Sequence, residues 1–194
     1  MRTITLALTL ALSSLGFSNL VSADWSLQEP SSIHFLTSKN THFTEVHQFK
    51  KFDAIVKNSG YTKINIDLAS VDTRIGIRDD RMQEHLFEVS RFSSASFEAE
   101  IPATVLAQAS AGKQTRFELN GKISLHGEQA AANCWVMISP NEDKSITVTS
   151  ITPIVIDANS FALVAGINKL KEIAGLKSIT NTVPVTFNLT FKAE

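Results

Sequence analysis

Two short polar clusters hold the residue types that can recognise a charged or carbonyl group. One surrounds an expected turn and the other opens an expected helix: Lys39, Asn40, Glu45 and His47, and Arg78, Asp79 and Arg81. Lysine and arginine suit an anion such as a diphosphate, whereas asparagine and histidine can hydrogen-bond a carbonyl oxygen. The same residues can instead form structural pairs, Arg78 with Asp79 and Glu45 with His47. The sequence leaves both interpretations open.

Motifs for metal binding or catalysis are missing from the sequence. No two of its five histidines have the His-Glu-x-x-His spacing, and His42 and His47 would point to opposite faces of a regular strand. The chain also lacks Gly-x-Ser-x-Gly and the glycine-rich phosphate-binding motifs. Asp79 and Asp80 are adjacent at a helix start, where they suit the helix dipole better than acid–base catalysis. We therefore expect no metal ion, no catalytic cofactor and no enzymatic activity.

Alternation of apolar and polar residues dominates the chain after residue 23. It is regular over 63–68, 95–101, 116–125, 146–149 and 185–192, and weaker over 33–37, 52–56 and 135–138. Each segment places its apolar side chains on one face of a strand. The pattern predicts about eight strands with one buried face each.

Two segments have helical spacing instead. Their apolar residues are Ile77, Met82, Leu86 and Val89, and Leu163, Ile167, Leu170 and Ala174. Asp157 or Asn159 is the expected N-cap of the second helix, and Gly175 its C-cap. A flat sheet would leave its edges and its apolar face uncovered, so we predict an all-β fold: one closed antiparallel barrel with one or two short helices.

Composition narrows the classes of partner. The 194 residues are 43% hydrophobic and carry 18 Lys+Arg against 19 Asp+Glu, without a basic run, so nucleic-acid binding is not expected. The single cysteine, Cys134, excludes an internal disulfide and lies in an apolar run, which predicts a buried thiol. Residues 24–194 hold eleven Phe and one Tyr. An eight-stranded barrel lined by phenylalanine is either filled by side chains or wide enough for one slender ligand.

The N-terminus has the anatomy of a secretory signal peptide. Arg2 precedes an apolar stretch from Ile4 to Leu12, and the small residues Val21-Ser22-Ala23 precede Asp24. This order predicts cleavage after Ala23 and export of a domain formed by residues 24–194. We expect the mature protein in the periplasm.

Several motifs, taken together, resemble the YceI-like family of bacterial lipid-binding proteins. They are Trp25-Ser-Leu27, Ser32-Ile-His-Phe35, Glu45-Val-His47-Gln-Phe49, Ser70-Val-Asp-Thr73, Ile77-Arg78-Asp79-Asp-Arg81-Met82, His85-Leu-Phe87, Gly121-Lys-Ile-Ser-Leu-His-Gly127 and Val183-Pro184-Val185-Thr186-Phe187. The resemblance covers residues 24–194. It implies a lipocalin-like eight-stranded barrel with a helix beside it, and binding of polyisoprenoids, including isoprenoid quinones.

That resemblance gives the two polar clusters a role at the mouth of a lipid cavity. Lys39, Arg78 or Arg81 would contact a diphosphate, and Asn40 and His47 would hydrogen-bond a quinone carbonyl. Glu45 and Asp79 are expected to belong to the same binding site. The lumen contacts expected for the isoprenoid chain are Phe35, Phe49, Phe52, Phe87, Phe97, Phe117 and Phe187. The leading hypothesis is a periplasmic carrier whose only bound molecule is an isoprenoid lipid.

Three alternatives remain open. The protein can be an enzyme that acts on an isoprenoid lipid, an accessory quinone-binding protein of a membrane cytochrome with that redox partner, or an outer-membrane barrel with apolar residues facing lipid. Two helical segments and the scarcity of Trp and Tyr weigh against the last. An exposed strand edge would allow a homodimer, which no sequence feature decides.

Overall fold

The computed structural model describes residues 24–194, so the expected signal peptide lies outside the described residues. This part of the chain contains three short α-helices: α1 (Gly76–His85), α2 (Ala103–Ser110) and α3 (Val164–Ile173). Two single turns of 3-10 helix are η1 (Leu68–Ser70) and η2 (Ala158–Phe161). The strands are β1 (Trp25–Lys39), β2 (Phe43–Phe49), β3 (Phe52–Val56), β4 (Tyr61–Asp67), β5 (Val71–Asp72), β6 (Ser94–Glu100), β7 (Thr115–Leu125), β8 (Glu128–Pro140), β9 (Ile146–Ser150), β10 (Ile154–Asp157) and β11 (Thr182–Ala193).

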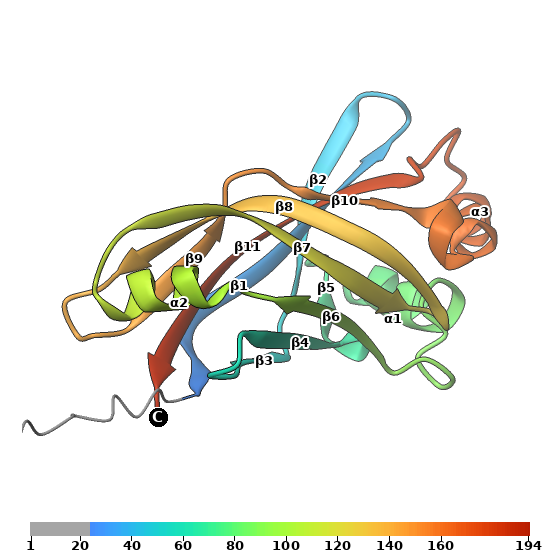
Figure 1. The fold of residues 1–194 in the computed structure, drawn as a ribbon. Helices are drawn as coiled ribbons and strands as arrows, with labels where there is room; N and C mark the ends of the chain where they lie inside the picture. Colours follow the sequence, from blue (N-terminus) through green and yellow to red (C-terminus); the bar gives the residue numbers. More distant parts are fainter. Residues whose placement is uncertain (1–23) are drawn as a thin grey trace, which may run out of the picture.

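Eight of these strands form a closed antiparallel ring (Figure 1). Their order is β1-β3-β4-β6-β7-β8-β9-β11, and β11 pairs back onto β1 from Trp25 opposite Ala193 to Phe35 opposite Val185. Each ring strand coincides with one of the eight segments predicted from alternation, although the segments 63–68 and 95–101 extend one residue past β4 and β6. The predicted all-β antiparallel barrel is confirmed, and closure removes the exposed edges that a flat sheet would have.

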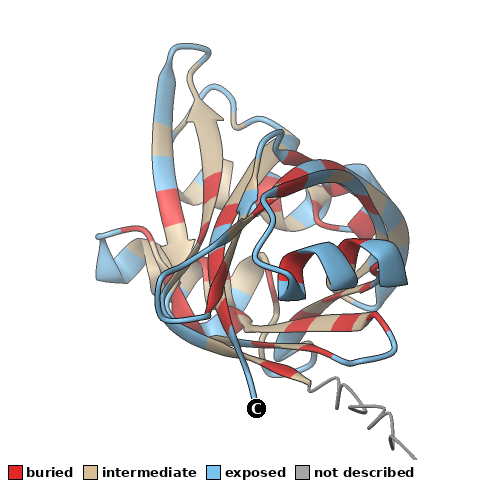
Figure 2. Cartoon of the chain, turned by 60° about the vertical axis from the view of Figure 1, so that its left-hand side comes forward, coloured by how far each residue is buried: buried red, intermediate tan, exposed pale blue. Residues whose placement is uncertain are grey.

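The other three strands extend one end of the ring. β1 is long enough to pair with β3 near its start and with β2 from Ile33 to Lys39. β5 adds to β2, and β10 follows β9 along the far half of β11. The hairpin of β1 and β2 therefore projects from the barrel (Figures 1 and 2). Alternation did not predict these strands, because β2 places polar Glu45 and His47 between its apolar residues and the other two are short.

The helices lie at opposite ends of the barrel, α2 at one end and α1 with α3 at the other (Figure 1). α2 was not predicted; its Val105 and Ala109 are buried in the main core. The expected cap of α3 is wrong, since Leu163 occupies the N-cap position and Asp157 instead caps η2 by accepting a hydrogen bond from the Asn159 backbone N–H. α3 ends as expected beside Gly175, which has φ of +63°.

Close packing of α1 on α3 depends on Gly166. A Cβ at this position would lie 2.4 Å from the His85 carbonyl oxygen and 2.8 Å from the Leu86 Cα. Only glycine allows the backbones to approach this closely. The two helices therefore form one cover over their end of the barrel.

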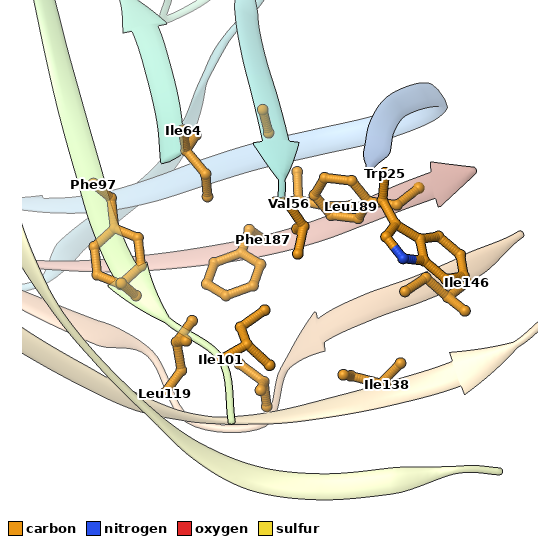
Figure 3. Packing of buried hydrophobic residues seen from close by; sticks show 14 of the residues in the cluster. Trp25, Val56, Ile64, Phe97, Ile101, Leu119, Ile138, Ile146, Phe187 and Leu189 are labelled. Atoms are coloured by element: carbon orange, nitrogen blue, oxygen red, sulfur yellow. The ribbon is translucent and has the colours of Figure 1, made fainter. Parts of the chain in front are cut away.

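The opposite end of the barrel is filled by side chains, and we call it the packed end. Figure 3 shows Phe97, Phe187 and Leu189 pointing into one shared interior, and Leu189 is only 1% exposed. Buried and exposed residues alternate along the strands in Figure 2. The apolar faces thus point inward, the reverse of what the outer-membrane hypothesis requires. Cys134 is buried here as predicted, and burial raises the pKa of its thiol to about 11.

Candidate ligand cavity

A cavity of about 470 Å³ lies inside the extended end of the barrel. Its volume falls within the roughly 300–1,000 Å³ typical of small-molecule sites. The walls come from β1 and β2 on one side, the ring strands β4, β6, β7 and β11 below, and α1 and α3 as the cover. Its aromatic wall consists of Phe35, Phe49 and Phe87, whose ring centroids lie 5.2 and 5.9 Å apart in sequence order.

The cavity opens between the β1–β2 hairpin, the start of α1 and the loop that follows α3. Ile75 and Ile77 line the cavity and are also 47% and 58% exposed, which places the opening beside them. The loop after α3 is tied to the hairpin, because the Asn40 backbone N–H donates to the Ser178 carbonyl and the Asn40 side chain accepts from the Lys177 backbone N–H. We call this opening the mouth.

Polar lining residues gather toward the mouth, while the rest of the wall is apolar. Seven of the thirty lining residues are polar or charged, and all seven belong to the hairpin, α1 or the loop after α3: Thr37, Lys39, Glu45, His47, Arg78, Arg81 and Thr180. An elongated apolar molecule with one polar end matches this division. The sequence clusters around residues 39–47 and 78–81 are thus brought together across the mouth.

Glu45 is the centre of the polar group. Its Oε2 lies 2.6 Å from Lys39 Nζ and 3.0 Å from an Arg78 terminal nitrogen. The hydrogen bond from Lys39, reinforced by that from Arg78, lowers the pKa of Glu45. This carboxylate therefore joins β1, β2 and α1, and it neutralises part of the cationic charge at the mouth.

His47 is nearly enclosed by its neighbours. It is 4% exposed, packs against Phe35 and has its Nε2 3.0 Å from Thr37 Oγ1. Burial, together with the nearby Arg78 cation, lowers its pKa. Its Nδ1 and the Arg78 Nε are buried without a hydrogen-bond partner. An unpartnered buried polar group costs about 1–3 kcal/mol, so these two atoms are a local cost of the polar arrangement at the mouth.

Two of the predicted head-group residues are engaged elsewhere. Asn40 uses its side chain on the Lys177 backbone and is not a lining residue. Asp79 accepts hydrogen bonds from the Thr73 backbone N–H and hydroxyl, fixing the start of α1 to the segment before it. The structural pair expected for Arg78 is formed with Glu45 instead.

The predicted phenylalanines divide between the two ends. Phe35, Phe49 and Phe87 line the cavity, whereas Phe97 and Phe187 are buried in the packed end and Phe52 and Phe117 pack against it. The sequence analysis did not assign the helices of the cover to the site, although their apolar stripes can be seen in the sequence. All four residues of the second helical stripe line the cavity, as do three of the first: Leu163, Ile167, Leu170 and Ala174, and Ile77, Met82 and Leu86.

Comparison with known proteins gives a family. The sequence model of the YceI-like domain matches residues 25–191. The chain belongs to the YceI-like family. A solved structure, that of a polyisoprenoid binding domain from Saccharophagus degradans implicated in plant cell wall breakdown, is 30% identical with a TM-score of 0.83. The match covers 88% of this chain and 98% of that one.

More distant structures share the fold. Burkholderia cenocepacia BcnA is 20% identical, with a TM-score of 0.65 over 82% of this chain and 95% of that chain. The YCEI protein of Campylobacter jejuni is 13% identical, with a TM-score of 0.52 over 76% and 85%. No curated protein matches the sequence.

Residues 24–194 contain neither a cluster of metal ligands nor a membrane-spanning helix. Across residues 24–194 no three His, Cys, Asp or Glu side chains are grouped so that they can hold a metal ion. No helix in the same range is long and apolar enough to cross a membrane.

Proposed function

We propose that this protein is an exported periplasmic carrier that holds one polyisoprenoid chain in the cavity under α1 and α3. The observation that carries the proposal is the division of the cavity into a long apolar wall and a polar mouth. The polyisoprenoid binding domain of Saccharophagus degradans, 30% identical, supports the ligand class. Each isoprene unit removed from water contributes about 3 kcal/mol before ordering costs, because it counts as roughly four CH₂ groups.

The polar mouth favours a neutral head group with carbonyl oxygens, as in an isoprenoid quinone, over a diphosphate. Glu45 already forms ion pairs with Lys39 and Arg78. Among the described residues, Arg81 is therefore the only Lys or Arg that lines the cavity without an ion pair. A diphosphate would need more free positive charge to replace its hydration. A carbonyl oxygen needs only a donor, and the Arg81 guanidinium lines the cavity and can supply one.

A binding role is proposed rather than catalysis. Glu45 is held in ion pairs with Lys39 and Arg78. The Thr37 hydroxyl lies 3.0 Å from His47 Nε2, but His47 Nδ1 has no hydrogen-bond partner in the part of the chain that the structure describes, so no third group there orients this imidazole as a general base. The membrane redox partner and the homodimer remain predictions from the sequence.

Mass spectrometry of organic extracts tests the proposal. The mature protein is purified from a periplasmic fraction without detergent and compared with a mock purification. A stoichiometric isoprenoid quinone is expected. A polyprenyl diphosphate would keep the carrier role but overturn the head-group assignment. Folded protein that carries no lipid, and takes up none when offered isoprenoid quinones or polyprenyl diphosphates, would contradict the carrier role.

A further inference from the structure

Large apolar side chains stand exposed around the mouth. Phe43, at the tip of the β1–β2 hairpin, is 61% exposed, and Ile75 and Ile77 stand beside the opening on the α1 side. Phe43 pairs with Lys39 and shares the strand face of Glu45 and His47, so it continues the cavity wall outward. These three residues form an apolar rim outside the polar mouth.

The mouth is also the cationic part of an acidic protein. The segments that surround it, 39–45, 74–81 and 175–180, hold five Lys or Arg against three Asp or Glu, whereas the rest of residues 24–194 holds twelve against sixteen. The side chains of Arg74, Arg81 and Lys177 form no ion pair within the described range. Exposed apolar side chains beside Lys and Arg side chains that form no ion pair are the combination that binds an anionic membrane surface.

We propose that the mouth docks on a bilayer that contains anionic phospholipids. Phe43, Ile75 and Ile77 enter the boundary between head groups and acyl chains, while Arg74 and Lys177 contact lipid phosphates. The cavity then faces the bilayer directly, and an apolar chain passes between them without crossing water. The docking surface goes beyond the proposed function, since it is measured without any isoprenoid; only its use in loading rests on that function.

Cosedimentation with protein-free vesicles tests the docking. The mature protein is mixed with vesicles of phosphatidylglycerol and phosphatidylcholine in equal parts, or of phosphatidylcholine alone. We expect binding to the anionic vesicles that falls with added salt. Ile77→Asp should weaken the partitioning at least about tenfold, because it removes an inserted side chain and adds a repelled charge. Arg74→Gln and Lys177→Gln should each weaken it about fivefold.

Val155→Asp is the matched control. Val155 is 60% exposed like Ile77, but it lies on the outer face of β10, between the inward-facing Ile154 and Ile156. This variant should sediment like wild type. All variants change exposed positions, and thermal unfolding checks that each is folded.

Three outcomes would overturn the docking surface. Wild-type protein can stay in the supernatant with anionic vesicles, or Ile77→Asp and Val155→Asp can bind equally well. Binding only when membrane proteins are reconstituted would assign the rim to a protein partner instead. Uptake of an isoprenoid from ethanol, measured separately, shows whether the carrier role survives any of these results.

Discussion

Ala95 and Ala99 lie on the same face of β6 and are almost equally buried, yet their surroundings differ. Ala95 lines the cavity, whereas Ala99 belongs to the packed end. In the packed end that contains Ala99, large side chains such as Phe187 and Leu189 fill the ring (Figure 3), and α2 covers this end (Figure 1). Beyond Ala95 the hairpin and the α1–α3 cover stand clear of the ring strands. The same alternation of apolar and polar residues therefore encloses a filled core at one end of the barrel and a cavity at the other. The difference lies in the hairpin and helices that follow the strands at each end.

The largest expected difference between the two ends is the cost of shortening a leucine. Leu189→Ala in the packed end should lower the free energy of unfolding by about 3 kcal/mol, because close-packed neighbours leave a new void. Leu170→Ala in the cover should lower it by only about 1 kcal/mol, since Leu170 is half-buried and already borders a cavity. Urea unfolding measures both. Equal losses would show that the two ends do not differ in packing.

Enlarging an alanine should also cost more in the packed end than beside the cavity. Ala99→Leu overpacks the filled interior and should destabilise the fold by about 1–3 kcal/mol. Ala95→Leu projects into the cavity and should cost less than about 1 kcal/mol while reducing lipid uptake. Thermal unfolding and uptake of an isoprenoid quinone measure the pair. Undiminished uptake by Ala95→Leu would mean that the lipid binds elsewhere.

The end of the barrel that contains the cavity is called the hollow end. The buried His47 should make the stability of this end sensitive to mild acid. Burial depresses its folded pKa below the usual 6.5, so the unfolded chain binds the proton first as the pH falls. Stability is then complete above pH 6.5 and decreases below it, by up to about 1.4 kcal/mol per pH unit, until the folded pKa is passed. Urea unfolding across this range should show the slope in wild type and in the hairpin-tip control His42→Gln. Its persistence in His47→Gln would exclude His47 as the cause.

The smallest effect is expected at Glu45. Its side chain is one-third exposed, so solvent screening limits the loss in Glu45→Gln to less than about 1 kcal/mol at neutral pH. Because Lys39 and Arg78 lower its pKa, this contribution is present above the usual value of 4.5 and disappears as the pH falls through the lowered pKa. Wild type and variant should therefore converge in acid. A difference that grows in acid would contradict the assignment.

The ring was predictable from sequence because its strands obey a simple rule. Each buries one face, so alternation marks all eight, and closure follows from the need to cover apolar faces and edges. The family motifs added the lipocalin-like architecture and the polar clusters. Lys39, Glu45, His47, Arg78 and Arg81 do meet around one opening.

The hollow end was harder to predict for physical reasons. β2 carries Glu45 and His47 on its inner face, where they serve the mouth rather than the core, and this breaks the alternation that marks a strand. Periodicity also cannot tell a side chain that faces a void from one that faces another side chain. That is why the sequence placed Phe97 and Phe187 with Phe35 and left Leu170 out of the site.

Photo-crosslinking tests most directly the claim that the lipid occupies the hollow end. An isoprenoid quinone with a photoreactive group in its tail is bound, irradiated and located by peptide mass spectrometry. Adducts are expected on wall and cover residues such as Phe49, Met82 and Leu170, and their yield should drop in Ala95→Leu. Adducts concentrated on the outer strand faces or on β8 and β9, with no change in Ala95→Leu, would contradict the account.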